Sequence, residues 1–350
     1  MPRSRGPLRA RRAWQAPAAL LAAIVLTAAC APPGNGAPIA ATRSAPPDAA
    51  ELTLGAFRID GERAAVDGDT LRVRGIDSVV RLVGLDTEER LTDPGDREDA
   101  ARDFASYARR NRGDSRRPVK YGTPLGDEAT SFARSFFAGH REVRLELDAQ
   151  GRGHGYFGRP LAHAFVERDG GDGHYNLEAV RAGMSPYFVK YGRSQRFDSE
   201  FRAAQSEARR ERRGIWSAAA AHYPDYDERL AWWEERARAI ARFDAAAQGK
   251  NDWFRLGDDG VWDALIAREG RVVTLLGALG SARTDRKPYL LPLSHRLRRD
   301  VNIVDWDRSF LRRFADEAGS SDHVQVRGRV SLHRGRPQIL YEDVEEVRAP

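Results

Sequence analysis

The chain has 350 residues, 41% hydrophobic and 31% charged, which is long enough for two modest domains with packed cores and a tail. Its formal net charge of +6 suits a polyanionic partner. A single cysteine excludes an intrachain disulfide and argues against thiol catalysis, and none of the eight histidines shows a metal-ligand spacing such as HxxxH.

The N-terminal segment has the pattern of an export signal. Met1–Arg12 is rich in arginine, Ala18–Ala29 is an apolar run too short to span a bilayer, and Cys30 follows directly. A cysteine after small residues resembles the bacterial lipoprotein pattern, in which the cysteine is lipidated. We therefore expect a signal peptide over residues 1–29 and a lipid anchor at Cys30 that holds the protein at the bacterial cell envelope. A conventionally cleaved signal and a secreted protein are the alternative.

A tether and then a strand-like region follow. Residues 30–51 are rich in proline and small residues without periodicity, which predicts a flexible tether. Ala64–Arg74 and Val79–Leu85 read as strands. Arg90–Lys120 is charged and contains Asp-Pro-Gly, which predicts a loop or partly helical excursion.

Strand and helix patterns alternate through residue 219. Apolar residues at helical spacing predict a helix that opens at Gly126 and continues through Phe137. The remaining predicted elements are strands at Glu142–Leu147 and Leu161–Val166 and helices at Asn176–Ala182 and Ser199–Arg213. This order favours a β-rich α+β domain over residues 52–219, a small antiparallel barrel with helices outside it.

The last third predicts a linker and a second β-rich module. Pro224–Ala247 reads as a bridging helix within a linker over residues 220–250. In residues 251–350, Arg271–Leu279 and Val301–Val304 read as strands and Ser309–Ala318 as a helix. Val324–Leu332 and Pro337–Tyr341 flank a turn and predict a hairpin.

This module resembles a small oligonucleotide-binding (OB) β-barrel through the hairpin sequence. It would then hold nucleic acid through backbone phosphates, on Arg327, Arg329, Arg334 and Arg336. A structural or protein-contact module with a solvated basic face is the alternative.

Three clusters of acids and arginines carry the chemistry. They are VDGDT (66–70), RLVGLDTEE (81–89) and YFGRPLA (156–162). Cutting a phosphodiester requires a hard cation held by carboxylates, a base that activates water, and cationic donors for the phosphorane. Asp-Gly-Asp alone is usually an exposed turn, and the second acidic turn could simply cap a helix. Their combination with arginines predicts a metal-dependent nuclease.

The clusters resemble those of the staphylococcal nuclease (thermonuclease) family over roughly residues 54–217. GDEATSFARSFF, NLEAVRAG and RRGIW resemble further family segments in the same order, with Ala179 in place of a leucine. The resemblance implies an OB-type five-stranded barrel with three helices and a Ca²⁺-dependent nuclease that cuts DNA and RNA with low sequence specificity, leaving 3′-phosphate ends. The implied roles are Ca²⁺ ligands at Asp69, Asp86 and the Thr87 carbonyl, a water-activating base at Glu89, and phosphate donors at Arg81 and Arg159.

Some positions depart from the family pattern. Glu88 stands where the family has proline, which would either tighten cation binding or loosen the turn. Tyr156 replaces a lysine, leaving one hydroxyl as a substrate contact. Tyr187 and Tyr191 fall near nucleotide-stacking tyrosines of the family, and packing at the barrel rim is the alternative.

Two other functions remain open from the sequence. A nuclease fold without activity could serve as a scaffold for nucleic acid or protein at the cell envelope. A structural lipoprotein could bind Ca²⁺ at the acidic turn for stability alone. The five intact acids and arginines argue against a pure scaffold, and no protein partner can be inferred.

Overall fold

The computed structural model describes residues 52–310, 313–314 and 322–348. The predicted signal peptide (1–29), the tether (30–51) with Cys30, and most of the helix predicted over Ser309–Ala318 lie outside the described residues. Within these described ranges, no helix is both long and apolar enough to cross a membrane.

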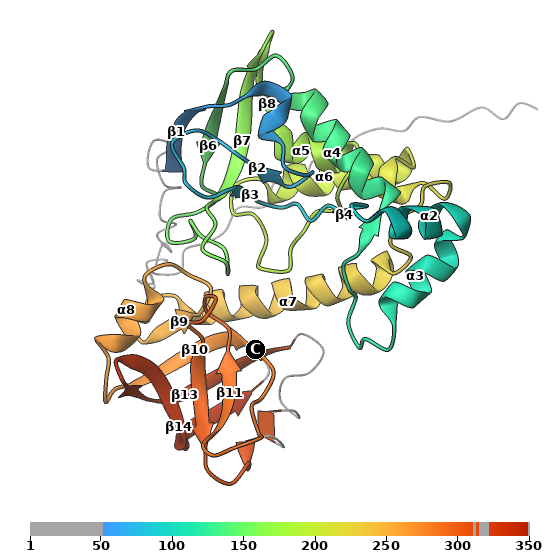
Figure 1. Ribbon diagram of the computed structural model, residues 1–350. Coiled ribbons are helices and arrows are strands. Elements are labelled where there is room, and N and C mark those ends of the chain that lie inside the picture. Colours follow the sequence, from blue (N-terminus) through green and yellow to red (C-terminus); the bar gives the residue numbers. More distant parts are fainter. Residues whose placement is uncertain (1–51, 311–312, 315–321, 349–350) are drawn as a thin grey trace, which may run out of the picture. The chain divides into compact units, whose positions relative to one another are not determined.

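The first sheet carries Arg81 in β3, and its strand β2 begins directly after Asp69. Its strands pair in the order β1–β6–β7–β3–β2, with β8 paired to β7 (Figure 1). β7 is antiparallel to β6 but parallel to β3, which places Arg81 opposite Leu161. The strands are β1 Thr53–Arg58, β2 Thr70–Leu71, β3 Val80–Leu82, β6 Glu142–Glu146, β7 Leu161–Arg168 and β8 Gly171–His174.

This sheet has six strands, one more than the five that the family resemblance implies. The sequence of β8, GDGH, has no strand pattern, and it joins the sheet because it lies antiparallel to β7 across a tight turn. No pairing among the described strands joins β1 to β2. The α+β class is confirmed, whereas closure into a barrel remains a prediction.

Three helices flank this sheet: α4 Pro124–Phe137, α5 Tyr175–Arg181 and α6 Asp198–Arg210. α4 begins where the Thr123 hydroxyl accepts from the Gly126 amide at 3.1 Å, an N-cap followed by a proline. Phe137 of α4 and Phe201 of α6 are fully buried in the same core. Burial of each such ring stabilises the fold by roughly 1.5 to 3 kcal/mol.

The charged excursion between residues 90 and 120 is largely helical. It forms α2 Pro94–Arg102 and α3 Phe104–Arg112, and each helix begins at an aspartate that caps it, Asp93 and Asp103. The buried Tyr107 of α3 packs edge-on against Tyr121, with ring centroids 5.7 Å apart. A two-stranded parallel sheet, β4 Glu89–Arg90 and β5 Gly122–Thr123, joins the ends of the excursion.

A 3-10 turn, η1 Gly61–Ala64, and another, η2 Gly214–Trp216, complete this region before the long helix α7 Tyr226–Ala247. The helix predicted over 224–247 is therefore present. Trp233 of α7 is buried in the same core as α4 and α6, with its ring 4.7 Å from that of Phe188.

The C-terminal region contains a second six-stranded sheet, in the order β11–β12–β14–β13–β10–β9, with its own core. The predicted hairpin is present, since β13 and β14 pair antiparallel around His333 and Arg336. The elements are β9 Trp253–Arg255, α8 Val261–Ile266, β10 Val272–Ala278, β11 Tyr289–Leu293, β12 Val301–Asp305, β13 His323–His333 and β14 Arg336–Arg348.

Candidate active site

The turn that carries Asp69 is held rigidly from both sides. The Asp69 amide donates to Asp67 Oδ1 at 3.0 Å, and the buried Tyr175 hydroxyl donates to the Gly68 carbonyl at 2.6 Å. A Cβ on Gly68 would lie 2.6 Å from Thr87 Cγ2, so only glycine lets this turn approach the second acidic turn so closely. Burial and the adjacent Asp69 carboxylate raise the pKa of Asp67 to about 6.

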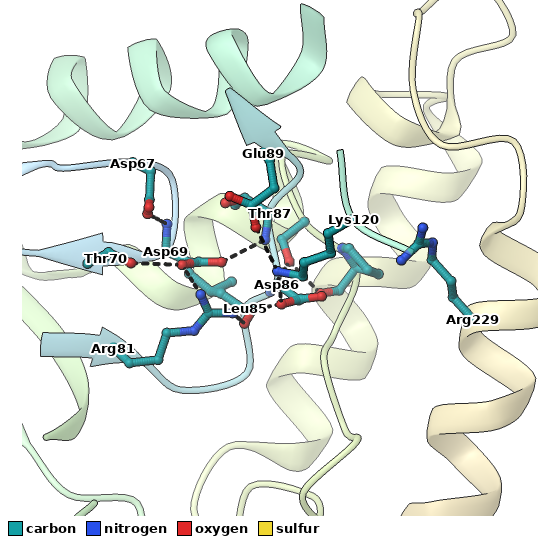
Figure 2. Close-up of polar contacts among 12 residues, drawn as sticks. Asp67, Asp69, Thr70, Arg81, Leu85, Asp86, Thr87, Glu89, Lys120 and Arg229 are labelled. Carbon is teal, nitrogen blue, oxygen red and sulfur yellow. Dashed lines mark hydrogen bonds and ion pairs between the residues drawn. The ribbon is translucent and has the colours of Figure 1, made fainter. Parts of the chain in front are cut away.

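Arg81 joins the two acidic turns. One guanidinium nitrogen donates to Asp69, and the other donates to Asp86 Oδ1 at 2.7 Å and to the Leu85 carbonyl at 3.1 Å (Figure 2). Asp69 and Asp86 are both buried. The planar fork suits this double contact, because it presents donors in fixed directions.

Backbone contacts fix the second acidic turn as well. The Thr87 amide donates to Asp69 Oδ2 at 3.0 Å, and the Asp86 amide donates to the Ser185 hydroxyl at 2.9 Å. The structure therefore brings Asp69, Asp86 and Thr87 together although they are up to 18 residues apart, and the contact of Thr87 is through its amide.

Lys120 completes the cluster, and the sequence reasoning did not single it out. Its ammonium lies 2.8 Å from Asp86 Oδ1 and 3.2 Å from Glu89 Oε1 (Figure 2). Burial favours the neutral form of Asp86, but Lys120 and Arg81 outweigh it and hold the pKa of this carboxyl below its ordinary value. The available signal was its rarity, because the chain has lysine only at positions 120, 190, 250 and 287.

Glu89 lies at the solvent-exposed side of this cluster. Its side chain is 50% exposed, so water can reach the carboxylate, and Lys120 contacts it from the Asp86 side. Its backbone is tightly placed, because a Cβ on Gly126 would lie 1.9 Å from the Glu89 carbonyl oxygen. The glycine in α4 thus sets how closely that helix approaches β4.

Glu88 points away from this cluster. Its carboxylate is buried and accepts from the Thr123 hydroxyl, from the Tyr223 amide at 2.7 Å and from the Tyr226 hydroxyl at 2.8 Å. Burial raises its pKa despite these bonds. This arrangement agrees neither with tighter cation binding nor with a looser turn. Glu88 instead links the turn to the N-cap of α4 and to the start of α7.

The backbone at Arg159 lies beside that of Arg81, but the Arg159 side chain lies outside the acid cluster. The Arg81 amide donates to the carbonyl of the next residue, Pro160, at 2.8 Å. The Arg159 guanidinium lies over the Phe157 ring, 5.6 Å from its centroid. Phe157 is exposed and packs edge-on against the half-buried Tyr156. This loop therefore presents a cation and two rings at the surface.

The two further tyrosines differ in environment. Tyr187 is buried, stacks on Phe201 with centroids 4.7 Å apart, and donates its hydroxyl to Asp198 at 3.0 Å. No open ring face remains for a nucleotide, so the packing alternative fits Tyr187. Tyr191 is 62% exposed and keeps an accessible ring. The sequence could not separate them, since both belong to one short aromatic segment.

The carboxylate oxygens of Asp69 and Asp86 are of the kind that a hard cation prefers, but two carboxylates are few for such a site. No group of three or more His, Cys, Asp or Glu side chains with metal-site geometry occurs among the described residues. Asp69 and Asp86 nevertheless converge on the single guanidinium of Arg81, and oxygen ligands of this kind are those that Ca²⁺ prefers. Backbone oxygens or water would have to supply the remaining ligands.

Part of the chain matches a known family. Residues 79–218 match the family model described as staphylococcal nuclease homologue. This segment includes Arg81, Asp86, Glu89 and Arg159, whereas Asp69 precedes it and joins the site through the contacts described above. No curated protein matches the chain.

Proposed function

We propose that this protein is a Ca²⁺-dependent phosphodiesterase that hydrolyses DNA and RNA, because residues 79–218 match the family model of the staphylococcal nuclease homologue. The observation that carries the proposal is the cluster of Asp69, Asp86 and Glu89 joined by Arg81 and Lys120. It combines fixed oxygen donors, an accessible carboxylate and cationic donors, which are the parts that phosphodiester hydrolysis needs.

Each residue has a definite task in this proposal. Glu89 holds a water and accepts its proton, which its exposure allows. Arg81 and Arg159 bind the oxygens of the scissile phosphate and stabilise the charge that develops there. When bound by Asp69, Asp86 and the Thr87 carbonyl, Ca²⁺ would supply Lewis-acid stabilisation of the phosphate. Arginines that address phosphate read no base, so sequence specificity is low. As the family resemblance implies, the water would bond to phosphorus while the bond from phosphorus to the 5′ oxygen breaks, which leaves a 3′-phosphate end and a 5′-hydroxyl.

The ion pairs within the acid cluster also fit a second candidate function, a scaffold without nuclease activity. Arg81 and Lys120 pair with Asp69 and Asp86, so both buried carboxylates have a cationic partner within the chain itself. A scaffold that binds nucleic acid or protein without cutting it would show this feature too.

Digestion by the purified protein separates the two candidates. The nuclease proposal predicts that plasmid DNA and single-stranded RNA are degraded with Ca²⁺ and that a chelator stops both reactions. The matched control is the double variant Asp69→Asn and Asp86→Asn. Degradation that continues in chelator would exclude the metal requirement, and intact substrate under all conditions would favour the scaffold.

We also propose that the protein is exported and anchored at the cell envelope through lipidated Cys30, or secreted if that residue is not modified. The proposal is supported by the sequence pattern of residues 1–30. Cys30→Ser should move the protein from the membrane fraction to the soluble exported fraction. If both forms fractionate alike, the anchor is wrong and plain secretion is favoured.

A further inference from the structure

Two cations near the candidate active site form no ion pair with a carboxylate among the described residues, although Asp322 acts on both at longer range. They are Lys190, which follows the segment that supports Asp86, and Arg236 of α7. Neither has a carboxylate within ion-pair distance among the described residues. Most buried or half-buried arginines of this chain do have such a partner, for example Arg229 with Asp225 at 2.6 Å.

Arg236 is the more unusual of the two. Arg236 is only 6% exposed, and its Nε has no hydrogen-bond partner in the described part of the chain. Burial lowers its pKa, which means that its surroundings oppose the charge. A buried guanidinium without an anion is costly, so this position favours the arrival of one.

Aromatic rings frame the two cations. The Lys190 ammonium lies 4.4 Å from the Trp232 ring centroid, and the Arg236 guanidinium lies 5.7 Å from it. The exposed ring of Tyr191 is 5.6 Å from Lys190 and 5.9 Å from Arg236. These rings hold the cations in place and leave a flat surface open to solvent at Tyr191.

The nearby acid is already engaged. Asp322 accepts from Trp232 Nε1 at 3.1 Å and from Arg117 at 2.7 Å, so its two oxygens are directed at those groups. Arg117 itself lies over Trp232 and adds positive charge to the neighbourhood. The buried His323 has its pKa lowered to about 3, by burial and then by Arg236 and Lys190, so it stays neutral at pH 7. The local balance is therefore cationic.

The segment that leads to Lys190 is joined to the second acidic turn by hydrogen bonds. The Phe188 amide donates to the Gly84 carbonyl at 2.9 Å, and the Ser185 hydroxyl accepts from the Asp86 amide at 2.9 Å. A phosphate chain bound at the acid cluster would therefore pass near the segment that carries Lys190.

We propose that Lys190 and Arg236, framed by Trp232 and Tyr191, form a subsite for a backbone phosphate of single-stranded nucleic acid, adjacent to the scissile phosphate. The inference rests on the proposed nuclease function. It extends the site beyond the family segment, because Trp232 and Arg236 lie in α7, after residue 218. α7 would thus be part of the substrate-binding surface in addition to linking the two β-rich regions of the chain.

Binding can test the subsite without turnover. Fluorescence anisotropy in chelator would compare labelled oligonucleotides of two and six nucleotides on the wild type and on Arg236→Met. The matched control is Arg238→Met, since Arg238 lies on the same helix, is 54% exposed and contacts Glu234 and Glu235. Arg236→Met should weaken binding of the six-nucleotide probe about tenfold and lower the magnitude of its log affinity versus log salt slope by about 0.7, the value for one phosphate of a single strand.

Further measurements keep the outcomes distinct. Lys190→Met should weaken binding in the same way, and Arg236→Lys should restore part of the lost affinity, because charge remains while the fork is lost. Unchanged affinity and salt slope in both methionine variants would overturn the subsite. Equal binding of both probe lengths, with protection from thermal unfolding by inorganic phosphate alone, would overturn the nucleic-acid assignment in favour of a free anion. Since no cleavage is measured, an inactive wild type would count against the proposed function and leave this result intact.

Discussion

Lys120 offers the sharpest quantitative test of how the acid cluster is balanced. Lys120→Met keeps an unbranched side chain and removes the ammonium that contacts Asp86 at 2.8 Å and Glu89 at 3.2 Å. The Lys120 side chain is 38% exposed, which places its contribution at the low end for charged hydrogen bonds, about 1 to 2 kcal/mol. The free energy of unfolding without metal should fall by that amount.

The same change should improve metal binding. A cation held by Asp86 must displace the Lys120 ammonium or tolerate its repulsion, and the variant removes this competition. A gain of about 1 to 2 kcal/mol corresponds to Ca²⁺ affinity roughly 5- to 30-fold higher. Stability in chelator and Ca²⁺ affinity therefore move in opposite directions.

Two assays measure these quantities. Urea unfolding in chelator gives the stability, and isothermal titration calorimetry with Ca²⁺ gives the affinity. Lys250→Met is the matched control, because the Lys250 ammonium lies 3.9 Å from the centroid of the Trp253 ring, away from these acids. Equal Ca²⁺ affinity in wild type and Lys120→Met would refute the competition, and weaker binding would show that Lys120 positions the acids instead.

Other substitutions test separate parts of the account. Arg159→Lys keeps the charge but loses the fork, so kcat/KM should fall by about two orders of magnitude, and steady-state kinetics that match wild type would remove Arg159 from the phosphate clamp. Glu88→Ala leaves three hydrogen-bond donors unpaired and should lower the free energy of unfolding in urea by about 3 kcal/mol, whereas Glu88→Gln should lower it much less. Equal losses in the two variants would count against the hydrogen-bond role of Glu88. Deleting residues 251–350 should raise KM on long substrates in a salt-dependent manner and spare kcat on a dinucleotide if the module holds nucleic acid, and a change in neither would point to a protein partner.

Binding of nucleic acid by the C-terminal module stays a prediction, because several of its arginines already have partners within the chain. Arg327 pairs with Glu345 at 2.9 Å, and Arg329 donates to the Gly270 carbonyl at 2.7 Å, so these two arginines are partly satisfied within the chain. Arg336 donates to the Arg298 carbonyl. Arginine count alone overstates how much of such a surface is available to phosphates.

Elements with a periodic apolar pattern were predictable from the sequence, and elements without one were not. α4, α6 and α7 repeat apolar residues at helical spacing, and the β13–β14 hairpin alternates around a short turn. α2 and α3 have weak apolar patterns and depend on aspartate caps and on Tyr107, so they were expected only as a partly helical excursion. β8 forms only because β7 is beside it.

The candidate site divides in the same way. Asp69, Arg81 and Asp86 were predictable because their residue types and order carry the chemistry. The positions of Lys120 and Glu88 depend on folding of the excursion and on the start of α7, which brings residues over 100 positions away to the second acidic turn. Single-sequence patterns contain no record of such long-range contacts.

The most direct test of the central claim is the turnover of Glu89→Gln set beside its substrate binding. Hydrolysis of DNA and RNA in saturating Ca²⁺ should fall by about two orders of magnitude or more, since the amide cannot accept the proton from water. Oligonucleotide affinity in chelator should stay at the wild-type value, because the acid cluster and its arginines are intact. Turnover equal to wild type would contradict the role of Glu89 and, with it, the proposed mechanism.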